Sequence, residues 1–390
     1  MLSKPVSRAI ALGISCLPLM FVAAPAAAAT YLGTVVASGL DNPRGLTFGP
    51  DGALYIAESG TTTGASPDGG PSFSNTGSIT RVFNGTSTRI VTGLPSVYSP
   101  ATNAISGPQD IAFDGSGSGY VVTGLGGNPA IRPAGSMLGH VLNFNNSGTF
   151  SSLANVSGFE STFNPAGGPI DSNPFHLAAG GGGFYVTDAG ANALYSLTTG
   201  GDLSLVASFP DRFIGPPVPA SNPVPTGVTV GPDGTVYVAE LTGFPFTPGA
   251  AQIYSIAPGS GVANVFATGF TNLTDLAFSP DGSLYALSYD LDGLLGPQTG
   301  GGIFRVLNNG TFESVYSTGL VNPTGLTIGD DGSFYVSTFS DNAAGAGQVL
   351  RVSAVPEPAS WAMLLIGFGA TGFAMRRSRG FSARLRSQPA

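Results

Sequence analysis

Carboxylates recur at one fixed offset in this sequence, three residues after a tyrosine that marks a repeated phrase. They are Glu58, Asp188 and Glu240. Because equivalent positions of a repeated fold lie at equivalent heights, we expect these side chains to point toward a common rim. Carboxylate oxygens suit a hard divalent cation, here Ca²⁺ or Mg²⁺, and they also suit general acid–base chemistry. The alternative is structural, since such carboxylates often accept hydrogen bonds from the backbone N–H groups of the next turn.

A second set of polar side chains stands where the first strand of each repeat begins. Four of them are candidate channel-rim residues, and threonines hold the other two positions: Arg44, Asp110, His176, Thr226, Asp275 and Thr324. An imidazole among carboxylates would hold a metal or move protons. The structural alternatives are a packed His176 and an Arg44 paired with a neighbouring carboxylate. The Walker loop, the Gly-x-Ser-x-Gly elbow and the His-Glu-x-x-His motif are absent from the sequence, so both binding and catalysis stay open.

The elements that must position these residues are six sequence repeats. Two clear copies span 42–58 and 224–240, and each runs through an apolar strand, a Pro-Asp-Gly turn and a tyrosine-bearing strand. Proline and glycine supply the backbone angles of such a turn. Two further strands follow in each unit. The marker tyrosines are Tyr55, Tyr120, Tyr185, Tyr237, Tyr285 and Tyr335. Strand–turn units of this length without a helical period predict propeller blades.

The two ends of the repeat region predict how the ring closes. The sixth repeat has only three strands, whereas residues 34–43 resemble 314–323, which contain the fourth strand of the fifth repeat. We therefore predict an all-β, six-bladed β-propeller over residues 30–354, closed when the N-terminal strand pairs with the last blade. The long insertions fall on the face opposite the Pro-Asp-Gly turns, so we expect any site there, around the central channel.

Both termini carry targeting features. Residues 1–29 combine Lys4 and Arg8 with an apolar run and an alanine-rich end, which predicts a cleaved signal peptide. The single cysteine, Cys16, lies inside that leader. At the other end, Pro-Glu-Pro precedes an apolar stretch over 359–375 and an arginine cluster. That order predicts a transmembrane helix with a cytoplasmic C-terminus, followed by a short tail over 380–390.

The charge of the predicted mature region excludes some partners. Residues 30–354 hold seven arginines, no lysine and 21 acidic residues, for a net charge of about −14. A basic surface for nucleic acid is missing, and bulk attraction to anionic lipid is excluded on the same ground.

The C-terminal segment resembles the PEP-CTERM sorting signal of Gram-negative bacteria over 355–379. The residues that carry the resemblance are Pro356, Glu357 and Pro358, then the apolar stretch and the arginines. The resemblance implies an exosortase-type processing enzyme as partner and cleavage near the Pro-Glu-Pro motif. It also implies a transient membrane anchor through the C-terminal helix, and a final location in the cell envelope or outside the cell.

The repeat phrase resembles NHL and SMP-30/gluconolactonase-like propeller repeats. The whole layout is similar to the ScyD/ScyE family of exported propellers, through residues 37–46, 107–111, 173–177 and 225–228. The family implies the fold and the location without one fixed activity. We expect a binding or interaction module for an extracellular polysaccharide or a small molecule. The alternative is an extracytoplasmic, lactonase-like hydrolase, in which Glu58 and Asp188 correspond to metal ligands at the channel mouth.

Overall fold

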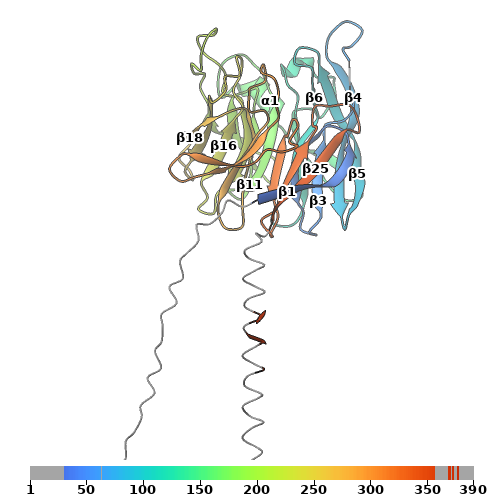
Figure 1. Cartoon of the computed structure of the whole chain (residues 1–390). Helices are drawn as coiled ribbons and strands as arrows, with labels where there is room; N and C mark the ends of the chain where they lie inside the picture. The colour runs from blue at the N-terminus through green and yellow to red at the C-terminus, as the bar shows by residue number, and fades with distance from the viewer. Residues whose placement is uncertain (1–29, 63, 356–367, 370, 373–375, 377–390) are drawn as a thin grey trace, which may run out of the picture. The chain divides into compact units, whose positions relative to one another are not determined.

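The computed structural model describes residues 30–62, 64–355, 368, 369, 371, 372 and 376. Within it, Tyr31–Val355 forms one compact unit, and the few described residues of the C-terminal segment belong to another. The first carries all of the sheet structure (Figure 1).

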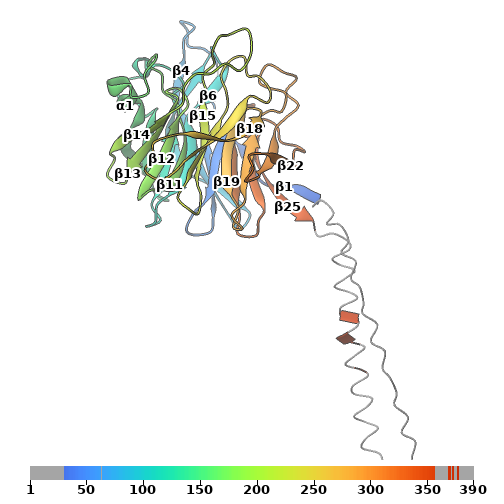
Figure 2. The same ribbon diagram turned by 90° about the vertical axis from the view of Figure 1, so that its left-hand side faces the viewer.

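Six antiparallel sheets form the six predicted blades (Figures 1 and 2). Their innermost strands contact one another in a closed ring, in the order β2, β7, β11, β15, β19, β23 and back to β2. Strands run outward from that ring: β2 (Pro43–Phe48), β3 (Leu54–Glu58), β4 (Ser72–Phe83), β5 (Thr86–Ser99) and β6 (Ala104–Ser106); β7 (Pro108–Phe113), β8 (Gly119–Thr123), β9 (His140–Phe144) and β10 (Phe150–Asn155); β11 (Pro174–Gly180), β12 (Gly183–Asp188), β13 (Ala193–Thr198) and β14 (Leu203–Ser208); β15 (Pro225–Val230), β16 (Val236–Glu240), β17 (Ala251–Ile256) and β18 (Asn264–Phe270); β19 (Leu273–Phe278), β20 (Leu284–Ser288), β21 (Gly302–Val306) and β22 (Phe312–Tyr316); β23 (Gly325–Ile328), β24 (Phe334–Thr338), β25 (Gly347–Val355) and β1 (Thr30–Leu40).

The predicted ring closure is confirmed. The last blade has the order β1-β25-β24-β23, so the first described strand completes the sheet of the final repeat. The Thr34 hydroxyl also donates a 3.4 Å hydrogen bond to the Arg351 carbonyl across this join. Pairing covers the edge of β25 that the last repeat would otherwise leave open.

The Pro-Asp-Gly turns form as their sequence requires. Gly52 takes φ of 73° and Gly234 takes 82°, a left-handed conformation that glycine adopts without steric cost. In the first turn, the Gly52 N–H donates to the Gly49 carbonyl at 2.9 Å, which closes the bend. These turns end the innermost strands, and they therefore define one end of the central channel.

The opposite end carries more structure than the sequence predicts. In the first blade, β4 and β5 are 12 and 14 residues long, and they recruit β6 as a fifth strand where four strands were predicted. A helix, α1 (Val156–Phe163), forms between the second and third blades, although the repeats show no helical period. Its cap explains it, because the Asn155 side chain accepts a 2.8 Å hydrogen bond from the Gly158 N–H. Figure 1 shows α1, β4 and β6 gathered at this end.

The predicted targeting segments fall mostly beyond the described residues. The signal peptide over 1–29 and the Pro356–Pro358 motif lie wholly outside them. Of the apolar stretch over 359–375, only four residues are described, and each is helical, as is Arg376. In the part of the chain with assigned positions, no helix is both long enough and apolar enough to cross a membrane.

Candidate functional site

Strand register shows which residues occupy the same position in each blade. In every blade, one innermost-strand residue pairs with the marker tyrosine, as Thr47 does with Tyr55 and Ala112 does with Tyr120. Two residues earlier, a ring of three glycines and three polar residues surrounds the channel: Gly45, Asp110, His176, Gly227, Asp275 and Gly325. Arg44, Thr226 and Thr324 stand one position before this ring. The six residues predicted to occupy one repeat position therefore come from two neighbouring positions, three from each.

The three polar members of this ring meet in the channel. His176 Nε2 lies 2.8 Å from Asp275 Oδ1, and His176 Nδ1 lies 3.2 Å from Asp110 Oδ2. Only the first contact has hydrogen-bonding geometry, so the second acts mainly through charge. The strands involved, β7, β11 and β19, belong to the second, third and fifth blades, so the imidazole bridges the channel rather than one pair of neighbours.

Burial and the attraction between opposite charges determine the protonation of the bridge formed by Asp110, His176 and Asp275. Burial opposes the charged form of His176, but the Asp110 and Asp275 carboxylates outweigh burial and raise the His176 pKa to about 9. Burial also raises the Asp110 pKa to about 7, against the opposing effect of His176. The imidazole is therefore charged at neutral pH, while Asp110 is poised to exchange a proton there.

Both carboxylates also tie neighbouring blades together. Asp110 Oδ2 accepts a 2.9 Å hydrogen bond from the Leu177 N–H, and Asp275 Oδ2 accepts a 2.6 Å bond from the Leu326 N–H. The ring glycines make room for this arrangement. A Cβ placed on Gly45 would lie 2.0 Å from Asp110 Oδ1, so a side chain there would displace the carboxylate.

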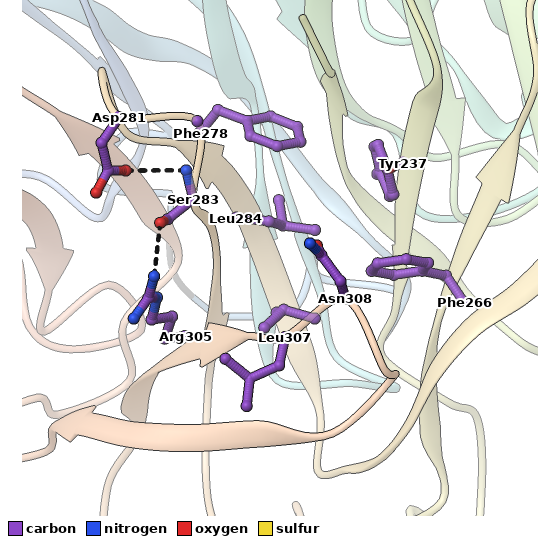
Figure 3. A pocket seen from close by; sticks show the side chains of 11 residues that line it. Tyr237, Phe266, Phe278, Asp281, Ser283, Leu284, Arg305, Leu307 and Asn308 are labelled. Carbon is purple, nitrogen blue, oxygen red and sulfur yellow. Dashed lines mark hydrogen bonds between the residues drawn. The ribbon is translucent and has the colours of Figure 1, made fainter. Parts of the chain in front are cut away.

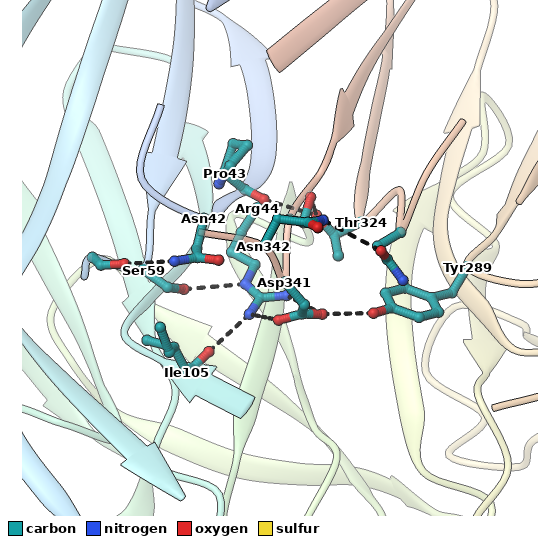
Figure 4. Close-up of polar contacts among 12 residues, drawn as sticks. Asn42, Pro43, Arg44, Ser59, Ile105, Tyr289, Thr324, Asp341 and Asn342 are labelled. Carbon is teal, nitrogen blue, oxygen red and sulfur yellow. Dashed lines mark hydrogen bonds and ion pairs between the residues drawn. The ribbon is translucent and has the colours of Figure 1, made fainter. Parts of the chain in front are cut away.

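Arg44 belongs to a separate polar layer nearer the loop-bearing end. Its guanidinium pairs with Asp341 at 2.6 Å and donates to the Ile105 carbonyl at 2.8 Å (Figure 4). Tyr289 donates a second hydrogen bond to Asp341 at 2.8 Å. Burial would raise the pKa of Asp341, but Arg44 and these hydrogen bonds hold it below its usual value. Arg44 thus pairs with a carboxylate from a loop whose sequence offered no motif to identify it.

The channel is sealed at the loop-bearing end and open at the turn end. Arg44, Thr226 and Thr324 are all less than 7% exposed. Toward the other end of the same strands, Phe48, Thr229 and Ile328 are half-buried. A cavity of about 340 Å³ occupies this wider part, lined by the innermost strands of all six blades and reaching inward to Asp110 and His176. The accessible space therefore lies at the opposite end from the one the loop insertions favour.

The other three candidate carboxylates are not brought together. Glu58 is fully buried against Arg89, with which it pairs at 2.7 Å, and it accepts a hydrogen bond from the Asp41 N–H. Glu240 pairs with Arg212 at 2.7 Å. Each of these carboxylates stabilises its own blade.

Asp188 also serves its own blade. It accepts hydrogen bonds from the Ser172 hydroxyl and from the backbone N–H groups of Asn173, Gly190 and Ala191. Among the described residues, no group of three histidine, cysteine or acidic side chains has the geometry to hold a metal ion. The arrangement instead supports hydrogen bonding and proton exchange at the inner end of the channel.

Comparison with known proteins identifies the C-terminal signal. Residues 354–379 match the PEP-CTERM protein-sorting motif. This segment is an exosortase sorting signal. This signal marks an exported protein that is anchored at the cell envelope before processing, in agreement with the expected export route.

Solved structures share the fold at low sequence identity. A glucose dehydrogenase is 15% identical, with a TM-score of 0.53 over 83% of this chain and 100% of its own. A gluconolactonase from Xanthomonas campestris is 13% identical, with a TM-score of 0.51 over 82% and 89%. A PQQ-bound aldose sugar dehydrogenase from Streptomyces coelicolor gives 14% and 0.51 over 84% and 99%. These likenesses support the propeller class alone, and no curated protein matches the sequence.

Proposed function

We propose that this protein works outside the cytoplasm as a binding module of the ScyD/ScyE type, and that it takes a small polar ligand into its central channel from the turn end. The observation that supports this most directly is the channel cavity of about 340 Å³, which ends on Asp110 and His176. Small-molecule sites typically occupy about 300–1,000 Å³. The cavity therefore suits one compact ligand, or the terminal residue of an extracellular polysaccharide.

The channel wall indicates the ligand class. Side chains alternate along a strand, so the residues two positions beyond the polar ring also face the channel. They are small and uncharged: Thr47, Ala112, Ala178, Thr229, Ala277 and Thr327. Their three hydroxyls can donate and accept hydrogen bonds, and Asp110 adds an acceptor at the inner end. A compact hydroxylated solute such as a monosaccharide matches this combination.

The test is ligand binding to the purified chain, measured by native mass spectrometry and calorimetry with a panel of monosaccharides. We expect one bound sugar per chain. The double substitution Thr229→Val and Thr327→Val preserves side-chain shape and removes two hydroxyls, so affinity should fall at least tenfold. Thr86→Val, on the exposed start of β5, is the matched control. Sugar binding that the double variant leaves unchanged, or no binding to any panel member, would refute a channel site.

One observation favours a second candidate, an extracytoplasmic hydrolase that uses acid–base chemistry. Asp110 lines the cavity, and its pKa of about 7 is near the value at which a general acid or base works best at neutral pH. Under this alternative, Asp110→Asn abolishes turnover of a lactone substrate while sugar affinity persists. Under the binding proposal, the unmodified protein shows no turnover of that substrate.

A further inference from the structure

A second hollow lies away from the channel, between the fourth and fifth blades at the turn end. Its volume is about 280 Å³. Three half-buried rings line it, Tyr237, Phe266 and Phe278, together with the polar residues Asp281, Arg305 and Asn308. Figure 3 shows Arg305 and Asp281 across the hollow from Tyr237 and Phe266, with Asn308 beside Phe266. An apolar wall facing a few polar groups is the usual composition of a small-molecule site.

Arg305 differs from its two repeat equivalents. Each of the three arginines pairs in register with a marker tyrosine, as Arg305 does with Tyr285. In the first blade Arg81 forms a 2.7 Å salt bridge with the turn carboxylate Asp51, and in the last blade Arg351 forms a 2.5 Å salt bridge with Asp331. At this repeat position, the protein itself therefore shows a guanidinium binding a carboxylate.

The sequence explains why Arg305 lacks that partner. The turn of the fifth blade has Ser279 where the other two turns have Gly49 and Gly329. The Ser279 hydroxyl and the Ser283 N–H both donate to Asp281, which lowers its pKa. Arg305 instead donates to the neutral Ser283 hydroxyl at 3.1 Å. Within the described propeller, Arg305 is the one exposed arginine without a carboxylate partner.

The small side chain of Val306 explains why the hollow beside Arg305 is open. At the position of Val306, the second blade carries Phe144, whose ring packs 6.3 Å from Tyr55 and 6.0 Å from Phe113. Because valine is smaller, the same notch between the fourth and fifth blades stays open. Around it, Tyr237 holds Phe266 and Phe278 in edge-to-face contacts at 5.1 and 5.5 Å, so the aromatic wall is preorganised.

We infer that this hollow binds a carboxylate-bearing sugar, a uronate residue of an acidic polysaccharide or the free sugar acid. Arg305 receives the carboxylate, as its equivalents receive Asp51 and Asp331. The half-buried rings take the apolar face of the sugar, while Asn308 and the free oxygen of Asp281 bind its hydroxyls. Because the propeller is strongly acidic overall, anion binding here depends on this one guanidinium and not on a general positive field.

The experiment is a calorimetric titration of the purified chain with glucuronate and, in parallel, with glucose. We expect glucuronate to bind at least tenfold more tightly, with the preference decreasing as ionic strength rises. Arg305→Gln should abolish the preference. Arg81→Gln is the matched control because it removes the repeat-equivalent arginine that is already paired, and it should leave the preference intact.

Three outcomes would overturn the inference. The first is equal affinity for the two sugars, or no glucuronate binding, in the unmodified chain. The second is a glucuronate preference that survives Arg305→Gln. The third is loss of glucuronate binding in the channel variant with Thr229→Val and Thr327→Val, which would assign the acid to the channel. If no sugar binds in the channel, the expected loss of glucuronate preference in Arg305→Gln stays the same. Failure of the channel proposal can therefore be distinguished from failure of this inference.

Discussion

Replacing His176 by glutamine tests the charge arrangement in the channel. The substitution keeps a polar side chain of similar length and removes the positive charge between Asp110 and Asp275, which lie 3.2 and 2.8 Å from the imidazole nitrogens. Both carboxylates are 2% exposed or less, so solvent cannot replace the lost charge. Removing one partner of a buried ion pair typically costs about 3–5 kcal/mol. For a domain of this size, that corresponds to a fall in Tm of roughly 5–10 °C.

The loss should depend on pH in a defined way. The folded-state pKa values of His176 and Asp110 are both raised, to about 9 and about 7. The native state therefore holds protons that the unfolded chain releases, and the bridge stabilises the fold less as pH rises. The His176 charge stabilises the native state fully below the unfolded-state pKa of about 6.5, and this contribution is lost as pH rises through about 9. The difference in unfolding free energy between the two proteins is therefore largest at about pH 7 and below, and it narrows toward pH 9, where the native imidazole loses its charge.

The assay is urea unfolding of both proteins from pH 7 to 10, where His140 is neutral in the folded protein and largely neutral in the unfolded chain, with His140→Gln as the control. His140 is the other histidine of the chain, and burial together with Arg132 lowers its pKa to about 4, so it is neutral throughout this range. Its Nδ1 contacts the Ser152 hydroxyl at 2.8 Å, and its replacement should cost about 1 kcal/mol at every pH. Adding Asp110→Asn to the His176 variant should recover part of the loss at pH 8. A His176→Gln gap as small and as flat as that of His140→Gln would refute a charged bridge.

Three further predictions concern the fold that supports the channel. Gly45→Ala should destabilise the protein by about 1–3 kcal/mol, because its Cβ meets Asp110 at 2.0 Å, whereas Gly115→Ala, with open space around the site, should change the unfolding free energy little. Arg89→Ala should cost about 3 kcal/mol in the same unfolding assay, since Glu58 is fully buried beside it; a cost near zero would show that the remaining hydrogen bonds suffice. Deleting β1 should expose the edge of β25, lower Tm and produce oligomers on size-exclusion chromatography; a monomer of unchanged Tm would contradict closure through this strand.

The architecture could be predicted from the repeats because each copy carries the same marker residue at the same place. A tyrosine in every copy fixes the strand register, and the resemblance between residues 34–43 and 314–323 identifies the closing strand. The predicted blades and their closure are confirmed on that basis. The helix α1 was missed because it occupies eight residues and depends on the Asn155 cap, a local signal that resembles any polar turn.

The site was harder to predict because it depends on a shift of one residue. Matching polar with polar aligned Arg44 with Asp110, whereas register aligns Asp110 with Gly45. Side chains alternate along a strand, so this shift separates two layers: the Asp110–His176–Asp275 bridge, and the Arg44–Asp341 pair that seals the loop-bearing end. The glycine at the ring position was the available signal, since at Gly45 only a glycine leaves room for the Asp110 carboxylate of the neighbouring blade.

The central claim, a channel open at the turn end and sealed at the loop-bearing end, is tested most directly by thiol reactivity. Cys16 is the only cysteine of the chain, so single cysteines can be placed in a C16S background. One replaces Thr229, which is half-buried in the cavity wall, and the other replaces Thr226, which is 1% exposed and lies beyond the polar ring toward the loop-bearing end. We expect a maleimide to label Thr229→Cys readily in the native protein, to label Thr226→Cys only after denaturation, and to be slowed at Thr229→Cys by bound sugar. Rapid native labelling of Thr226→Cys, with protection of Thr229→Cys in the absence of ligand, would show that the channel opens at the other end.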